Sequence, residues 1–406
     1  MKHLSYLFLL VLLFGSGCGS TKKLQQLLLD GSRTPAAFSE TISYEEVGGL
    51  IVVEAKLGGA TRRFLFDTGA PNLISKELAR EIGAVVHTRQ RVRDSQGKAE
   101  SLEFAYLDSL EIGGVNFYQT GAIIADLSAS VELSCYEVEG IIGANLMRLA
   151  CWQIDYQRKE LHFASHRDSL SIPEGAVSIP FQASLQGSPS ISMQLGSKRL
   201  QALIDSGSNS GFDGSLATLQ QLRKELSFPA YSGFGSNQAG LFGLNRDTSY
   251  LGLLPDVRLD TISFGPQVVE FQRPSGAKIG NEFFRQFLVT LDWQANELLL
   301  NAVTAPPPAG EPTFGLNAIY DEGKLRVGFV WDGSPAAEAG IEPGDRILFM
   351  NGLDFINLPV PKYCQYLLAR PLKYEWQTLD LFLEKDGGTQ KFRLQKRDLF
   401  SAEGTR

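Results

Sequence analysis

Phe64-Leu65-Phe66-Asp67-Thr68-Gly69-Ala70 has a second version further along this chain, Ala202-Leu203-Ile204-Asp205-Ser206-Gly207-Ser208. In both versions three apolar residues lead into an aspartate, a hydroxyl residue and a glycine. Short apolar runs bounded by Gly, Asp and Ser are typical of buried strands that end in tight turns. The sequence therefore predicts two equivalent strand-and-turn units, each ending in an aspartate.

Two further landmarks recur at nearly the same spacing. Ile141-Ile142-Gly143-Ala144-Asn145 is matched by Lys278-Ile279-Gly280-Asn281, and Gln153-Ile154-Asp155-Tyr156 by Thr290-Leu291-Asp292-Trp293. The spacing is 138 residues between the two motif aspartates and 137 residues for each of the other two landmarks. A fixed period is the sequence sign of repeated structural units. We therefore predict two similar units, residues 41–168 and 169–304.

Both units are predicted to be mainly β. Between the landmarks, the apolar runs are short and rich in Ile, Val, Leu and Phe, the composition of buried strands. Helices are expected only over Ser75–Ile82, over Leu216–Leu226 and in short turns after Gly143 and Gly280.

An Asp-Thr/Ser-Gly loop followed by a downstream Ile-Gly strand resembles the aspartic peptidase family, in both its pepsin and its retropepsin branches. The resemblance extends from Ile51 to Asn301. It implies two β-barrel lobes related by a pseudo-twofold axis within one chain. It also implies a catalytic pair, Asp67 and Asp205, and active-site loops built from Thr68, Gly69, Ser206 and Gly207.

Two carboxyl groups suffice for this chemistry. One takes a proton from water while the other protonates the carbonyl oxygen, so the pair must share one proton. Two carboxylates that close cannot both ionise, and their pKa values separate. Cleavage of a glycosidic bond also uses two carboxyl groups, but it requires neither the glycines nor a duplicated unit. We predict an aspartic endopeptidase acting on peptides or proteins; the alternative is a peptide-binding envelope lipoprotein that has lost turnover.

No cofactor or metal is expected. The four histidines lack metal-ligand spacing, and the sequence contains no Cys-x-x-Cys. The formal net charge of −7 gives no basic stripe for phosphates, so nucleic acid is not an expected partner.

Glycine-containing turns lie between the aspartate motif and the Ile-Gly strand in both units, where peptidases of this family have hairpin flaps. The candidate flap residues are Gln96 and Gly97 in the first unit and Phe234 and Gly235 in the second. Glycine is a favoured residue at the tip of a hairpin. These turns are therefore expected to close over a substrate.

A proline-rich linker at 305–312 separates the repeated units from a third domain. Gly333 to Gly352 resembles the corresponding stretch of PDZ domains in bacterial envelope proteases, which implies an α+β PDZ-like domain at 313–397. The resemblance places the carboxylate-binding loop at Phe314, Gly315 and Leu316. In that mode, backbone donors capture a peptide C-terminus while the peptide adds a strand to the sheet.

The N-terminus predicts export. An apolar run from Leu4 to Phe14 is the length of a signal-peptide core and too short to span a bilayer. Gly15-Ser16-Gly17-Cys18 resembles a bacterial lipobox, which implies a signal peptide at 1–18, a lipid on Cys18 and a tether at 19–40. We expect an exported, membrane-anchored bacterial lipoprotein that faces the periplasm.

Three cysteines remain in a compartment where disulfides persist. Cys135 and Cys151 lie in the same unit and either pair or remain as buried free thiols. The sequence assigns no state to Cys364.

Overall fold

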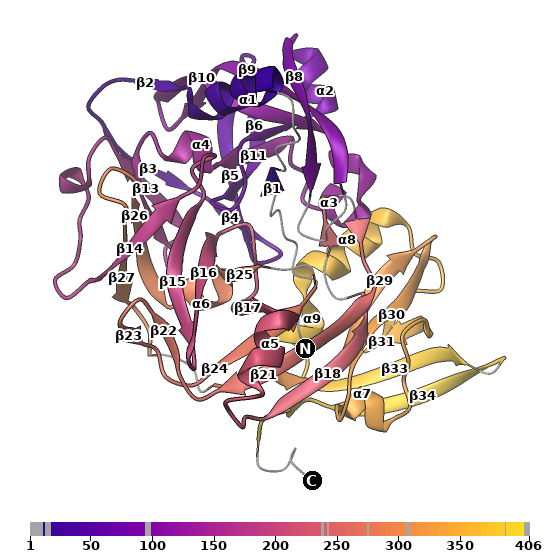
Figure 1. Ribbon diagram of the computed structural model, residues 1–406. Coiled ribbons are helices and arrows are strands. Elements are labelled where there is room, and N and C mark those ends of the chain that lie inside the picture. Colours follow the sequence, from indigo (N-terminus) through magenta and orange to yellow (C-terminus); the bar gives the residue numbers. More distant parts are fainter. Residues whose placement is uncertain are drawn as a thin grey trace.

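The computed structural model describes residues 11–12, 18–93, 99–236, 239–241, 243–273, 276–305, 309–385 and 387–401 (Figure 1). The fold is mainly β, which confirms the predicted class. Over these ranges, none of the helices has the length and apolar character needed to cross a bilayer. Pro306–Pro308 of the expected linker and most of the expected signal peptide lie outside them.

Part of the segment predicted as a tether, residues 19–40, forms a helix and a short strand that lie against the first repeated unit. Leu24, Leu27 and Leu28 are spaced to fall on one helical face, and all three are buried. This helix packs against β8 and β10, as Figure 1 shows. The N-terminal elements are β1 (Val11–Leu12), α1 (Cys18–Leu29), β2 (Ser32–Thr34) and β3 (Ser39–Ser43).

The first repeat, residues 45–164, has strands, three short helices and one 3-10 turn in the part that the structure describes, which leaves out 94–98. Its elements are β4 (Glu45–Val47), β5 (Leu50–Leu57), β6 (Ala60–Asp67), β7 (Leu73–Ser75), α2 (Lys76–Glu81), β8 (Val86–Arg93), β9 (Ala99–Ile112), β10 (Val115–Ala125), η1 (Leu127–Ala129), α3 (Val131–Ser134), β11 (Gly140–Gly143), α4 (Ala144–Met147), β12 (Cys151–Asp155) and β13 (Glu160–Ala164). A 3-10 turn, η2 (Arg167–Ser169), and β14 (Val177–Ala183) follow.

The second repeat, residues 189–302, has the same order of elements around its aspartate. Its elements are β15 (Pro189–Leu195), β16 (Lys198–Asp205), β17 (Phe212–Ser215), α5 (Leu216–Leu222), β18 (Ala230–Gly235), β19 (Ala239–Gly240), β20 (Gly243–Leu244), β21 (Asp247–Leu254), β22 (Val257–Leu259), β23 (Ile262–Ser263), β24 (Gln267–Gln272), β25 (Ala277–Gly280), α6 (Asn281–Phe284), β26 (Phe287–Asp292) and β27 (Glu297–Ala302).

Strand pairing is the same in the two repeats. β6 lies parallel to β11, which lies antiparallel to β7, and β7 lies parallel to β10. In the second repeat β16, β25, β17 and β24 have the same four places and directions. Both expected helices form, as α2 and α5, because Ser75 and Ser215 cap their first turns by accepting from the amides of Leu78 and Thr218.

A shared sheet and a shared core join the repeats. The strands β3, β13, β12, β26, β27 and β14 lie side by side in that order, all antiparallel, so that β12 of the first repeat pairs directly with β26 of the second. The rings of Phe66 and Trp152 pack together with their centroids 5.1 Å apart. They belong to an apolar core that continues to Phe212 and Phe283. Burial on this scale is the main stabilising contribution to such a pair of units.

The C-terminal unit, residues 312–398, packs against both repeats (Figure 1). Its core is continuous with apolar residues of the first repeat, including Leu65 and Tyr136. Its elements are β28 (Pro312–Thr313), β29 (Leu316–Asp321), β30 (Lys324–Trp331), α7 (Pro335–Glu338), β31 (Arg346–Met350), β32 (Leu353–Asp354), α8 (Val360–Ala369), α9 (Pro371–Tyr374), β33 (Thr378–Lys385), β34 (Gly388–Gln395) and β35 (Arg397–Asp398).

The cysteine pairing differs from the one considered from the sequence. Cys135 forms a disulfide with Cys364, across 229 residues, whereas Cys151 is a buried free thiol. The prediction of a Cys135–Cys151 bond is therefore wrong. Cys135 follows α3 on the side where α8 packs, and Cys151 lies in the central sheet opposite Asp292. The disulfide ties the first repeat to α8 of the C-terminal unit.

Candidate active site

Asp67 and Asp205 are the last residues of equivalent strands. β6 ends at Asp67, opposite Gly143 of the parallel strand β11, and β16 ends at Asp205, opposite Gly280 of β25. The apolar lead-in residues Phe66 and Ile204 are buried, which fixes where each strand ends. Each aspartate therefore stands at the end of a buried strand, directly before a turn.

The two turns interlock through their hydroxyl residues. Thr68 Oγ1 donates to the carbonyl of Ile204 at 2.7 Å, and Ser206 Oγ donates to the carbonyl of Phe66 at 2.8 Å. In return, the amide of each residue donates to the hydroxyl of the other, at 3.0 Å in both directions. Because all four hydrogen bonds are buried, they fix the loops relative to each other.

The glycines of the two turns bring the carboxyl groups together. A Cβ atom placed on Gly69 would lie 2.8 Å from Asp205 Oδ1 and 3.2 Å from Asp67 Oδ1, so both oxygens surround one point. A Cβ on Gly207 would lie 2.3 Å from Asp67 Oδ2. Neither position tolerates a side chain, because each glycine backbone lies directly against the opposite aspartate.

Both carboxyl groups are fully buried, and their pKa values are shifted. Burial raises the pKa of Asp67 well above its usual range, and the neighbouring Asp205 carboxylate raises it further. Burial also raises the pKa of Asp205, to about 6, although the Lys278 ammonium lowers it while Asp213 raises it. Mutual repulsion of two buried carboxylates disfavours double ionisation. The pair is therefore suited to hold one proton.

Asparagines behind the loops support the site and had no role assigned from the sequence. Asn145 Oδ1 accepts from the amide of Asn72 at 2.7 Å in the first repeat. Asn281 Nδ2 donates to the carbonyl of Ser206 at 2.8 Å, and Tyr156 Oη donates to Asn281 Oδ1 at 2.8 Å. Each asparagine lies one or two residues after its Ile-Gly glycine, a recurrence visible in the sequence.

The candidate flap of the second repeat is a strand. Phe234 and Gly235 end β18, which pairs with β21, and the Phe234 ring is 49% exposed with the Arg246 guanidinium 5.0 Å from it. β18 also pairs antiparallel with β30 of the C-terminal unit, Phe234 opposite Val330. The flap strand is thus bonded to the third unit as well as to its own repeat.

The candidate flap of the first repeat has its tip outside the described residues. Gln96 and Gly97 fall in that gap. The strands on either side, β8 and β9, pair antiparallel up to Arg93 opposite Ala99.

The loop expected to bind a carboxylate precedes β29, and its amide is already bonded. Phe314 and Leu316 are buried. Gly315 has a φ of +86°, which favours glycine, and its amide donates to Thr313 Oγ1 at 2.8 Å. In this conformation the Gly315 amide is not available to a peptide carboxylate.

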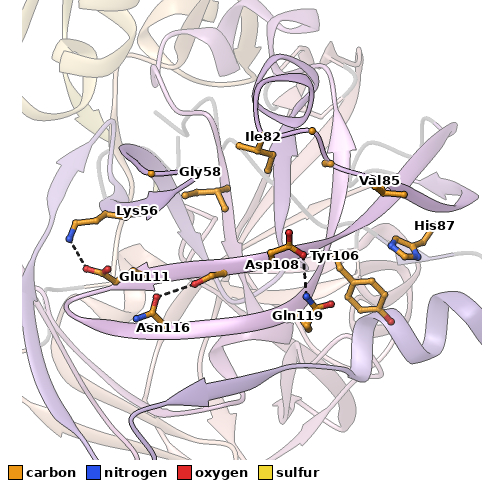
Figure 2. Close-up of a pocket in the computed structure, with 15 residues that line it drawn as sticks. Lys56, Gly58, Ile82, Val85, His87, Tyr106, Asp108, Glu111, Asn116 and Gln119 are labelled. Atoms are coloured by element: carbon orange, nitrogen blue, oxygen red, sulfur yellow. Dashed lines mark hydrogen bonds and ion pairs between the residues drawn. The ribbon is translucent and has the colours of Figure 1, made fainter.

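A surface pocket of about 630 Å³ lies at the edge of the first repeat (Figure 2). Neither Asp67 nor Asp205 lines this pocket. It lies beside the Gly58 turn and the end of α2, and its walls carry the Lys56–Glu111 ion pair and the Gln119–Asp108 hydrogen bond. Ser109 Oγ also donates to Asn116 Oδ1 in this pocket, and Tyr106 Oη donates to Asp30 Oδ2 outside its lining.

Within the described ranges, no group of three or more His, Cys, Asp or Glu side chains could hold a metal ion.

Comparison with known proteins supports the interpretation of the first repeat. The aspartyl protease family model matches residues 53–146, which contain Asp67, the β8–β9 hairpin and the Ile-Gly strand. This match supports an aspartyl protease domain of the retropepsin type. A search of curated proteins found no match to the chain.

Proposed function

We propose that this protein is an aspartic endopeptidase in which Asp67 and Asp205 activate a water molecule for attack on a peptide bond. One observation carries the proposal: two buried aspartates, 138 residues apart, face one point through interlocked Asp-Thr-Gly and Asp-Ser-Gly turns. The repeats then act as two lobes of one site, and a single chain suffices. The family match over the first repeat supports the same class.

The pKa shifts define the expected pH dependence. Turnover requires one protonated and one ionised carboxyl group, so activity should rise as the pair loses its first proton and fall when it loses the second. Because the pKa of Asp205 is about 6 and that of Asp67 is also raised well above its usual range, the rise should lie near pH 6.

Cleavage of a peptide library by the full chain tests this function. We expect Asp67→Asn and Asp205→Asn each to abolish cleavage as completely as the double variant, because residues that act as one unit are not additive. A hydroxyl-bearing analogue of the tetrahedral intermediate should inhibit the wild-type protein. Peptide binding without cleavage at any pH would instead favour the alternative, a peptide-binding protein that has lost turnover.

We also propose that the C-terminal unit is a PDZ-like domain that binds peptide C-termini. The Phe314-Gly315-Leu316 loop leads into β29, and α8 lies near that strand, with Tyr320 and Tyr363 in ring contact at 5.3 Å. Binding would require the Gly315 amide to exchange the Thr313 hydroxyl for the carboxylate. Titration of full-length Asp67→Asn protein with free-acid peptides and their C-terminal amides is the test. Equal binding of both would exclude carboxylate capture.

The same proposal places the protein in the envelope as a lipoprotein anchored through Cys18 and facing the periplasm. The Cys135–Cys364 disulfide supports export, because such bonds persist in oxidising compartments. Mass spectrometry of the N-terminal peptide from membrane fractions would detect the lipid on Cys18. An unmodified N-terminus beginning before Cys18 would contradict this localisation.

A further inference from the structure

Three charged side chains lie side by side in the second repeat, next to the aspartate site. Asp213 of β17 is paired in register with Glu270 of β24 on one side and with Lys278 of β25 on the other. Lys278 Nζ lies 3.1 Å from Asp213 Oδ2. All three residues are at most 1% exposed. We call Asp213, Glu270 and Lys278 the charged triad.

The first repeat has apolar residues at the same three places. There, Leu73 of β7 is paired with Ile123 of β10 and with Ile141 of β11, through the same parallel and antiparallel ladders. All three are buried in an apolar cluster. The equivalence follows from strand register, so the two repeats differ at these places in chemistry and agree in backbone arrangement.

The charged triad is a costly way to fill this space. Removing charges from water is unfavourable, and replacing a buried ion pair by apolar residues is often neutral or stabilising. The first repeat shows that Leu and Ile fit the same backbone. Fold stability alone therefore does not explain the charges, and buried charges beside a cleft are frequent at functional sites.

The triad is connected to the loop that holds Asp205. Ser208 Oγ and Ser210 Oγ are 2.8 Å apart, and Ser210 Oγ donates to Asp213 Oδ2 at 2.7 Å. Lys278 precedes by two residues Gly280, which is paired in register with Asp205. A continuous polar path thus runs from the Asp205 loop to the ammonium group.

The triad makes the surroundings of the two aspartates unequal. The charged groups acting most on Asp205 are Lys278 of β25, Asp213 of β17 and its partner Asp67, whereas the one acting most on Asp67 is Asp205. Lys278 favours the ionised form of Asp205 and outweighs Asp213, which opposes it. Glu270 of β24 lies one strand further away, beside Asp213.

We propose that Lys278, oriented by Asp213, is a positioning residue that keeps the negative charge of the pair on Asp205 and the shared proton on Asp67. This inference rests on the proposed peptidase function and assigns the two roles within it. The water proton passes to Asp205 as the water oxygen bonds to the carbonyl carbon, and the Asp67 proton passes to the carbonyl oxygen. In the second step, the C–N bond breaks, the Asp205 proton goes to the amine, and a hydroxyl proton returns to Asp67.

Two single variants test the assignment because they should move the pH profile in opposite directions. The acidic limb is the rise in kcat/KM with pH on the low-pH side of the profile, where Asp205 loses its proton. Lys278→Met removes the cation, so the acidic limb should move to higher pH. Asp213→Asn removes an anion, so the acidic limb should move to lower pH. Each shift should be on the order of one pH unit. Lys198→Met, which removes a cation from a partly exposed pair with Glu225 on the same repeat, is the matched control and should leave this low-pH side of the profile in place.

A triple variant covers the case in which a single substitution prevents folding. Asp213→Leu with Glu270→Ile and Lys278→Ile gives the second repeat the apolar residues of the first and leaves no buried charge uncompensated. Its acidic limb should also move to higher pH, because Lys278 acts on Asp205 more strongly than Asp213 does. An unshifted limb in the folded triple variant would overturn the proposal.

A readout independent of cleavage separates this inference from the peptidase function. With ¹³C-labelled aspartate carboxyl groups, and with Asp67→Asn and Asp205→Asn for assignment, NMR titration should show Asp205 ionising before Asp67. In Lys278→Met, the order in which Asp205 and Asp67 ionise should reverse, or the difference between their two pKa values should become smaller. If the wild-type protein titrates in this way but cleaves nothing, the charge assignment stands and the peptidase function fails. If it cleaves peptides but Asp205 titrates identically in wild type and Lys278→Met, the proposal is wrong.

Discussion

Thr68 and Ser206 bind each other twice across the two repeats. The Thr68 amide donates to Ser206 Oγ and the Ser206 amide donates to Thr68 Oγ1, both at 3.0 Å. Each hydroxyl also donates to a backbone carbonyl of the opposite repeat. The relative position of the two aspartates therefore depends on two side chains that take no part in proton transfer.

Removing either hydroxyl should destabilise the protein and lower activity. Thr68→Val and Ser206→Ala each leave a buried amide and a buried carbonyl without partners, which costs roughly 1 to 3 kcal/mol per group. Urea unfolding and kcat/KM measure the two effects. The double variant should cost less than the sum of the singles, because both act on one network. Thr389→Val, at an exposed strand position, is the control. If the losses of stability of Thr68→Val and Ser206→Ala simply added in the double variant, the interlocking of the two loops would be contradicted.

Asp205→Asn should stabilise the protein at neutral pH. Burial raises the pKa of Asp205 from its ordinary value of 3.8 to about 6, so the folded state binds a proton that the unfolded state has lost. The free energy of unfolding therefore falls as pH rises from 3.8 to about 6, and above pH 6 it is lower by about 3 kcal/mol. The variant should unfold at higher temperature than wild type at pH 8, with the difference vanishing below pH 4. Asp168→Asn, at an exposed position, should show no such pH-dependent gain.

Loss of the Cys135–Cys364 disulfide should release the C-terminal unit from the first repeat. The bond closes 229 residues, for which the chain-entropy model gives up to roughly 5 kcal/mol. Cys135→Ser with Cys364→Ser should lower the unfolding temperature, and reductant should lower that of wild type but not of the variant. Cys151→Ser is the comparison at the free thiol. Mass spectrometry of unreduced peptides checks the pairing, and two free thiols at 135 and 364 would contradict it.

Gly235→Ala should disrupt the contact between β18 and the C-terminal unit. Gly235 has a φ of +131°, and a Cβ there would lie 2.1 Å from the Gly328 carbonyl. The amide of Ser236 donates to that carbonyl at 2.8 Å, so the strands must separate to accommodate a methyl group. Hydrogen exchange should accelerate in both β18 and β30, while peptide cleavage falls if β18 acts as a flap. Gly388→Ala, which meets no neighbouring atom, should change neither.

The sequence by itself determined the local units. An apolar run into Asp-Thr-Gly or Asp-Ser-Gly specifies a buried strand and its turn, and the constant spacing of the landmarks indicates that the unit occurs twice. The mainly β class, the strands that end at Asp67 and Asp205, and helices α2 and α5 follow from such short-range patterns and are present in the structure. The helix that begins the segment predicted as a tether, residues 19–40, was not predicted, because its sparse leucines form an apolar face only once the segment is helical.

Only the tertiary structure decided which distant surfaces meet. Cys135 pairs with Cys364 because α8 packs beside α3, and no spacing rule connects residues so far apart in sequence. The bond between β18 and β30, and the placing of Asp213 between Glu270 and Lys278, are likewise set by strand register. A shift of one residue would turn each of these side chains to the opposite face of its sheet. Register is fixed by the packing of whole units against each other, and that packing places a charge next to Asp205 that has no counterpart at Asp67.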